Sequence, residues 1–463
     1  MVQLETRNQI VSALVAIMLF AQLLAFGAVG GFPAAFFAFT EIFVCLAVIG
    51  LLAKGTADRF WVEMGPILLL FLAAMAWAGT PLVLAMFPAL PHAPLLAPDA
   101  TRLELLKLAG VGALGLTGGL IGLSRSRLQH FIINVAMIGL AYTLLALWVG
   151  QVSPLTVWGQ PKGAHAYRFT GTFLNANAAG CVFGMIGLLS LGLLQSLLKR
   201  TDLRAARLMS LLWLMLTACA AVAAFGACVL TQSRTSLVLA AVLGVTVVVI
   251  EAKRGAKRTT GRAIRSRFIM AGAVLILLLS LGLGATQVSS RWSTVLIDAQ
   301  LRGEAYVHYL GAVGRSPWFG YGLGGFRMLH ESILTPSLAP AMWDFGAAHS
   351  AVTQAALEGG LPFLLLLAGA VGMIVVRIVK VGANRYRRGA VVTGVIAAVV
   401  LAFAFSFVDI ALNVPAIAAL AVVLLGIAWG DALARSLPAP ATPSGDGVGS
   451  VDHRMSGSDW ARG

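Results

Sequence analysis

Twelve long apolar runs constrain this chain more than any other feature of its sequence. An α-helix needs roughly 20 apolar residues to cross about 30 Å of hydrocarbon. Runs of this kind lie at 10–28, 33–53, 66–87, 103–123, 131–149, 171–197, 208–231, 235–250, 268–287, 350–379, 389–408 and 414–434. With 59% hydrophobic and only 11% charged residues, the composition excludes an ordinary soluble protein. The sequence therefore predicts an all-α, polytopic membrane protein with about twelve transmembrane helices.

The distribution of basic residues predicts how the chain lies across the membrane. Lys and Arg concentrate in alternate loops, most densely in 251–267, and loops rich in these residues stay in the cytoplasm. Both termini are therefore predicted to be cytoplasmic. The net charge of +15 then reflects this topology and contacts with anionic membrane lipids, and it gives no support for a nucleic-acid partner.

The predicted helices divide the chain into four parts. Residues 1–287 hold nine of the predicted membrane helices, and residues 350–436 hold the other three. Residues 288–349 are a long polar stretch on the predicted outer side, and their many aromatic side chains predict a partly helical loop that folds back onto the helix ends. The Pro-, Gly- and Ser-rich residues 437–463 predict a disordered cytoplasmic tail.

The apolar runs contain few residues of the kinds that bind metals or relay protons. The four cysteines form no CxxC pair, which supports neither a disulfide framework nor a zinc site. Glu41 and Asp409 are interpreted as acids within spans. Either could serve as a proton or cation site of a transporter, or could pair with a lysine or the backbone.

Arginines on the outer face are the first candidates for chemistry. Arg234 lies in TQSRTS, at the tight join of two predicted spans, where a charge is costly unless it meets a partner or an anionic ligand. The alternative is an arginine that reaches the membrane surface or pairs with a carboxylate. Arg302 shares one face of a predicted amphipathic surface helix with Tyr306 and Tyr309. Taken alone, contact with lipid headgroups explains Arg302 better than catalysis does.

A histidine and two asparagines are candidates at two further helix ends. His349 opens the helix after the long loop, where a neutral imidazole can accept a proton as a general base, although a structural role is the alternative. Asn175 and Asn177 can hydrogen-bond sugar hydroxyls, or they can cap and pack helices. The glycine-rich stretch 320–326, GYGLGGF, follows no strand, so it predicts a turn and not a nucleotide-binding loop.

Four of these stretches together resemble a known family. In order they are RFTGTFLNANAAG (168–180), TQSRTSL, LRGEAYVHYLGAVGRSPWFGYGLGGF and AHSAVTQAALEGGLPF. Their order, spacing and common outer placement are similar to those of the bacterial O-antigen ligase family, which includes O-antigen and exopolysaccharide polymerases. The resemblance covers about 168–365 in motif detail, and the twelve-helix layout extends it to the rest of the chain.

The resemblance implies a reaction in the bacterial inner membrane and the residues that perform it. A glycan carried on undecaprenyl diphosphate would pass, on the periplasmic face, to an acceptor hydroxyl, without a metal or nucleotide cofactor. Arg234 and Arg302 match the two arginines that engage the donor diphosphate, and His349 matches the base that activates the acceptor. Further possible substrate contacts are Arg168, Asn175, Asn177, Tyr306, Tyr309 and Arg291.

Two questions stay open at the level of sequence. The acceptor could be a lipid A core, which makes the protein a ligase, or a growing glycan chain, which makes it a polymerase. A multi-pass transporter or lipid flippase of polysaccharide export is the alternative from another class, and it would use Glu41 and Asp409 in coupling. Charged groups gather on one face instead of at mid-membrane, which favours the enzyme.

Overall fold

The architecture comes from a computed structural model, which describes residues 2–52, 58–87, 93–201, 207–256, 295–336, 339–343, 345–382 and 389–436. The predicted ninth span (268–287), Arg291 and the predicted tail (437–463) lie outside the described residues. Arg302 lies within a described helix, but its side chain is outside the description.

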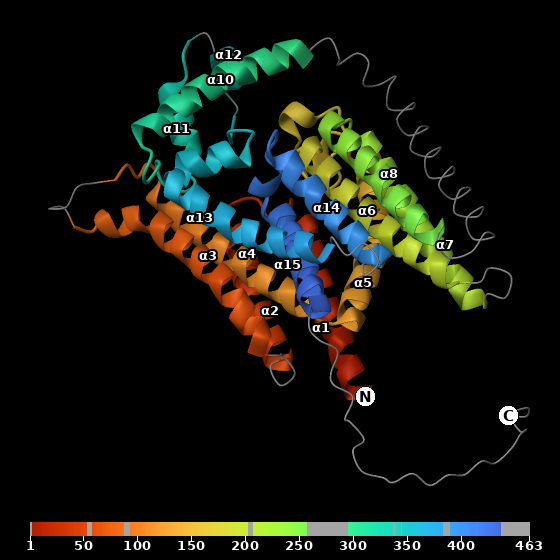
Figure 1. Ribbon diagram of the computed structural model, residues 1–463. Coiled ribbons are helices and arrows are strands. Elements are labelled where there is room, and N and C mark those ends of the chain that lie inside the picture. The colour runs from red at the N-terminus through yellow and green to blue at the C-terminus, as the bar shows by residue number, and fades with distance from the viewer. Residues whose placement is uncertain are drawn as a thin grey trace, which may run out of the picture.

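The described chain is a bundle of long helices, as the apolar runs predicted (Figure 1). Ten of its helices are long and apolar enough to cross a membrane, and the shorter apolar helix α14 lies among them. The helices are α1 Val2–Leu24, α2 Gly31–Leu52, α3 Asp58–Leu84, α4 Pro98–Gly122, α5 Arg125–Val152, α6 Ala176–Arg200, α7 Leu208–Leu230, α8 Arg234–Ala256, α13 Ala351–Gly382, α14 Ala390–Ser406 and α15 Pro415–Ser436. Eleven of the twelve predicted spans therefore correspond to described helices. The prediction of an all-α, polytopic membrane protein is confirmed.

Small residues bring the central helices into backbone contact. A Cβ at Gly118 on α4 would overlap the carbonyl oxygen of Val423 on α15, and one at Gly426 would overlap that of Gly115. Gly192 on α6 and Gly394 on α14 approach each other in the same way. In lipid, where no hydrophobic force drives helices together, such close approach is what gains packing energy. It explains why α15 and α6 are the most buried spans of the described chain, at 89% and 78% of their apolar windows.

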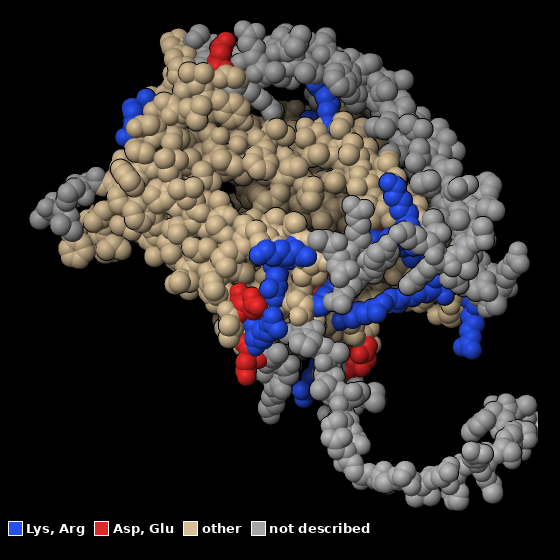
Figure 2. All heavy atoms as spheres, viewed as in Figure 1, with Lys and Arg blue, Asp and Glu red and all other residues tan. Residues whose placement is uncertain are grey.

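Three helices, one long and two short, cover one end of the bundle, and we call them and their connections the cap. They are α10 Val295–Arg315, α11 Phe326–Ile333 and α12 Ala339–Met342. Figure 1 shows them at the end away from the N-terminus, and the space-filling view shows a hollow between them and the helix ends below (Figure 2). Tyr309 and Phe326 form the cap's own apolar core with Leu357 of α13. The long loop thus folds back onto the helix ends, as its aromatic residues predicted.

The cap is attached through the glycine-rich stretch, which is a turn as predicted. The backbone N–H groups of Tyr321 and Gly322 donate to the carbonyl oxygens of Leu357 and Glu358, at 2.8 and 3.0 Å. Gly320 and Gly322 have φ of +63° and +90°, a region that L side chains rarely adopt. Trp77 of α3 supports the same turn, because its Nε1 donates to the Trp318 carbonyl at 2.9 Å.

Gly360 is the position on α13 where this attachment depends most on glycine. Its φ is +77°, and a Cβ there would overlap the carbonyl oxygen of Trp318 in the turn. We expect Gly360→Ala to lower the free energy of unfolding by about 3 kcal/mol through backbone strain and overlap. Thermal unfolding in detergent measures it. Gly372→Ala, on the same helix with open space around its Cβ, is the matched control and should unfold like the parent chain. Equal loss in both variants would contradict the role of Gly360.

Candidate active site

His349 lies at the seam between the cap and α13, with 18% of its side chain exposed. Its φ is +52°, an unusual conformation for a residue with a side chain, and such strain is concentrated at functional sites. Two cap residues hold it there. The Tyr306 hydroxyl donates to the His349 carbonyl oxygen at 3.1 Å, and the Phe345 ring packs edge-on against the imidazole with centroids 4.6 Å apart. The position and direction of the imidazole are therefore set by the cap.

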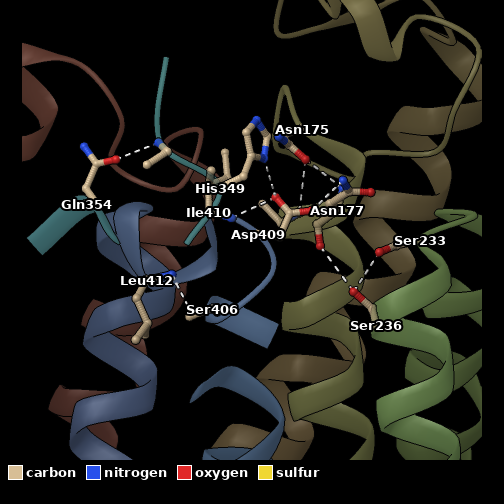
Figure 3. A network of polar contacts seen from close by, with 12 residues as sticks. Asn175, Asn177, Ser233, Ser236, His349, Gln354, Ser406, Asp409, Ile410 and Leu412 are labelled. Atoms are coloured by element: carbon tan, nitrogen blue, oxygen red, sulfur yellow. Dashed lines mark hydrogen bonds and ion pairs between the residues drawn. The ribbon is translucent and has the colours of Figure 1, made fainter. Parts of the chain in front are cut away.

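A carboxylate faces one nitrogen of this imidazole. Asp409 lies in the connection between α14 and α15, not inside a span, and its side chain is 6% exposed. Its Oδ1 accepts from the Ile410 N–H at 2.8 Å and lies 3.5 Å from His349 Nδ1. That nitrogen is buried and has no closer hydrogen-bond partner among the described residues. Figure 3 shows the other ring nitrogen pointing away from Asp409, where an acceptor group could meet it.

Asn177 and Arg168 hold the carboxylate from its other side. Asn177 Nδ2 donates to Asp409 Oδ2 at 2.8 Å, and Arg168 Nη2 donates to Asn177 Oδ1 at 2.9 Å. Arg168 also donates through Nε and Nη2 to the carbonyl oxygen of Thr231, at 3.0 and 2.9 Å. Thr231 caps the end of α7, where helix carbonyls lack partners within the helix. These successive contacts, which we call the His349 network, join four separate parts of the sequence: Arg168, Asn177, Asp409 and His349.

Asn175 has the capping role that was one of its two predicted readings. Its Oδ1 accepts from the N–H groups of Asn177 and Ala178, at 2.7 and 3.2 Å, so it is the N-cap of α6. The helix therefore begins at Ala176 and not at 171, where the apolar run begins. Because Asn175 fixes where the helix begins, it also sets the position of Asn177 beside Asp409.

Arg234 belongs to the same corner of the molecule. It is the first residue of α8, and the first turn of this helix is tied to α6 by Ser236, whose hydroxyl donates to the Asn177 carbonyl at 3.4 Å (Figure 3). Ser236 also contacts Ser233 at 2.9 Å between hydroxyl oxygens. A helix N-terminus carries a partial positive charge, so Arg234 and the end of α8 together favour an anion here.

The tyrosines of α10 differ in what they contact. Tyr306 reaches His349, and Arg302 precedes Tyr306 by one helical turn on the same helix. Tyr309 is 2% exposed in the core of the cap, where its hydroxyl meets His330 Nδ1 at 3.0 Å. Burial also raises the pKa of Tyr309. Tyr309 thus packs inside the cap, and its role as a substrate contact stays a prediction.

Glu41 contacts residues of α1 and α4, and not those of the His349 network. It is 4% exposed on α2, where it accepts a hydrogen bond from Gln22 of α1 at 2.8 Å and lies against Gly110 of α4. Asp409 belongs to the His349 network. Of the two acids that suggested a transporter, Glu41 is therefore hydrogen-bonded between helices and Asp409 lies beside His349. Within the described residues, no three His, Cys, Asp or Glu side chains gather closely enough to hold a metal ion.

Residues 219–368 match the family model described as O-antigen ligase. The segment 219–368 is O-antigen ligase-like. The ligase-type segment runs from α7 to the middle of α13 and contains Arg234, Arg302 and His349. A search of curated proteins finds no match for the chain. The family supports membrane glycan transfer of the ligase or polymerase type.

Part of the site lies outside the ligase-type segment. Asp409 and the pair Arg168 and Asn177 come from beyond its two ends. The family resemblance pointed to neither Asp409 as the partner of His349 nor Thr231 as that of Arg168. The signal in the sequence for Asp409 is an acid directly after an apolar run, followed by Asn413 and Pro415, a pattern typical of a helix end.

Proposed function

We propose that this protein transfers a glycan from undecaprenyl diphosphate to an acceptor hydroxyl at the cap end of the bundle. The observation that carries the proposal is the contact of His349 with Asp409 beside the turn that bears Arg234. The cap end is then periplasmic and the two chain termini are cytoplasmic. In the space-filling view most of the visible Lys and Arg side chains lie at the opposite end, in keeping with this orientation (Figure 2).

The residues support a single displacement. Asp409 at Nδ1 favours the imidazole tautomer whose Nε2 is free of its proton, so Nε2 can take the proton of the acceptor hydroxyl. The acceptor oxygen then bonds to the anomeric carbon, and the bond from that carbon to the diphosphate oxygen breaks. The leaving diphosphate gains negative charge, which Arg234, the N-terminus of α8 and Arg302 stabilise. One such displacement inverts the configuration at the anomeric carbon.

The 3.5 Å separation between His349 Nδ1 and Asp409 Oδ1 is longer than an ordinary hydrogen bond. Hydrogen bonds at catalytic groups are often long until substrate is bound. The cap holds His349, and the α14–α15 connection holds Asp409. A small movement of the cap on substrate binding would therefore shorten this contact.

Reconstituted transfer tests the proposed function. Purified protein in liposomes is given a lipid-linked glycan with either a lipid A core or a second lipid-linked chain as acceptor, with and without chelator. We expect transfer that survives the chelator. Addition of a single glycan to the lipid A core would show a ligase, and a ladder of longer lipid-linked chains would show a polymerase. Absence of transfer to both acceptors, from a protein that binds the donor, would contradict the proposal.

Replacing Asp409 tests the network separately. We expect Asp409→Asn to lower kcat by at least about 10²-fold, because the amide neither fixes the tautomer of His349 nor stabilises its protonated form. The KM for the donor should stay nearly constant, since Asp409 acts through His349. Steady-state kinetics with the lipid-linked donor measures both. Asp431→Asn, which removes an acid paired with Arg435 at the opposite end of the bundle, is the control and should keep kcat. A loss of donor binding alone in Asp409→Asn would contradict the assignment.

A further inference from the structure

A groove lies at the opposite end of the bundle from the cap, between α3, α13 and α15. Its volume is about 260 Å³. Ile67, Met373 and Val376 give it apolar walls, and Trp429 of α15 also lines it. Met373 and Val376 are 40% and 50% exposed, so the walls are open on one side. The spans α3 and α13 are among the least buried, at 22% and 17% of their apolar windows, which means that the groove opens toward lipid.

Basic side chains line the end of the groove. Arg377 Nη2 donates to Glu63 Oε1 at 3.2 Å and to Ser436 Oγ at 2.9 Å. The Arg377 Nε is buried and has no hydrogen-bond partner among the described residues, which is costly for a charged donor. Lys380 lines the groove one turn farther along α13 and is exposed. The lining holds two basic side chains, Arg377 and Lys380, and one acid, Glu63, so its charge is positive overall. Glu63 Oε1 also lies 3.6 Å from Arg59 Nε.

We propose that this groove binds the headgroup of an anionic phospholipid. A lipid phosphate would satisfy Arg377 Nε and neutralise Lys380, while the start of an acyl chain would cover Met373 and Val376. Basic pockets between spanning helices are suited to anionic headgroups. A soluble anion would leave the apolar walls in contact with water, and a zwitterionic lipid would place its own cation beside Lys380. The ligand is therefore an anionic lipid of the surrounding membrane, and its site is distinct from that of the glycan donor.

Lipid titration followed by native mass spectrometry tests the charge. The delipidated full-length protein in detergent is titrated with phosphatidylglycerol or phosphatidylethanolamine. We expect Lys380→Gln to bind phosphatidylglycerol about fivefold more weakly than the parent chain, the change expected for one basic residue near a membrane surface. Lys253→Gln is the matched control and should bind like the parent chain. It removes an exposed lysine in the last turn of α8, at the same end of the bundle as the groove. Equal affinity of the parent chain and Lys380→Gln would overturn the proposal.

A second pair of variants tests the apolar walls. Val376→Trp fills the groove and should weaken phosphatidylglycerol binding severalfold, whereas Val400→Trp, at a similarly exposed position on α14, should not. Phosphatidylethanolamine binding as tightly as phosphatidylglycerol would show ordinary boundary lipid and overturn the proposal. Displacement of the lipid by millimolar inorganic phosphate would show a phosphate site without lipid selectivity, and would overturn it too.

Discussion

Transfer is expected to fall about 10²- to 10⁴-fold when His349 is replaced by asparagine, the range for loss of a general base. Asparagine is the informative substitution because it tolerates the left-handed backbone at this position, where φ is +52°. The fold and the contact of the backbone carbonyl with Tyr306 should therefore survive. The rate of transfer from lipid-linked donor to acceptor is the measurement, and thermal unfolding of the same sample checks the fold.

His308→Asn is the matched control for this substitution. His308 lies on α10 in the cap, is exposed, and is two residues from Tyr306. The control should retain parent activity. If His349→Asn also retains it while folded, the proton must leave the acceptor by another route, and the proposed mechanism would be wrong.

The second large effect is expected at Arg234. We expect Arg234→Ala to reduce kcat/KM for the lipid-linked donor about 10²- to 10³-fold, because the diphosphate loses one of the groups that stabilise its growing charge. Arg234→Lys should recover part of this loss, since lysine supplies the charge but not the two-pronged geometry of a guanidinium. Donor turnover, followed as release of undecaprenyl diphosphate, measures both variants.

Arg102 offers a control for the general effect of charge at this end. It lies near the start of α4, close to the cap, is 63% exposed and pairs with Asp99 at 2.5 Å. Arg102→Ala should therefore keep kcat/KM. Equal losses in Arg102→Ala and Arg234→Ala would show that only the general positive field attracts the donor, which would contradict a direct role for Arg234.

The fold was predictable from sequence because crossing a membrane demands long apolar helices, and these leave a plain signal. Helix ends were less predictable. The sixth run begins at 171, yet Asn175 caps the helix and moves its start to Ala176. The contact of α4 with α15 through Gly118 and Gly426 was not predictable, because glycines in apolar runs do not indicate which helix they face.

The site was predictable only in part, for a related reason. Arg234 and His349 could be proposed because they follow or precede apolar runs in recognisable stretches. Asp409 could not be assigned to His349, since the pair depends on how the α14–α15 connection packs under the cap. Arg168 and Asn177 were predicted to be substrate contacts, and their hydrogen bonds in the structure join them to Thr231 and Asp409.

The division of the site between distant parts of the chain limits how freely its segments could be exchanged among relatives. A graft of 219–368 into another helical frame would bring Arg234 and His349 with it. Asp409 and Asn177 would stay behind, so the recipient would have to supply an acid after its penultimate helix and an amide near the start of the helix that packs against it. Chimeras of this kind should succeed or fail at those two seams, however well the grafted segment itself folds.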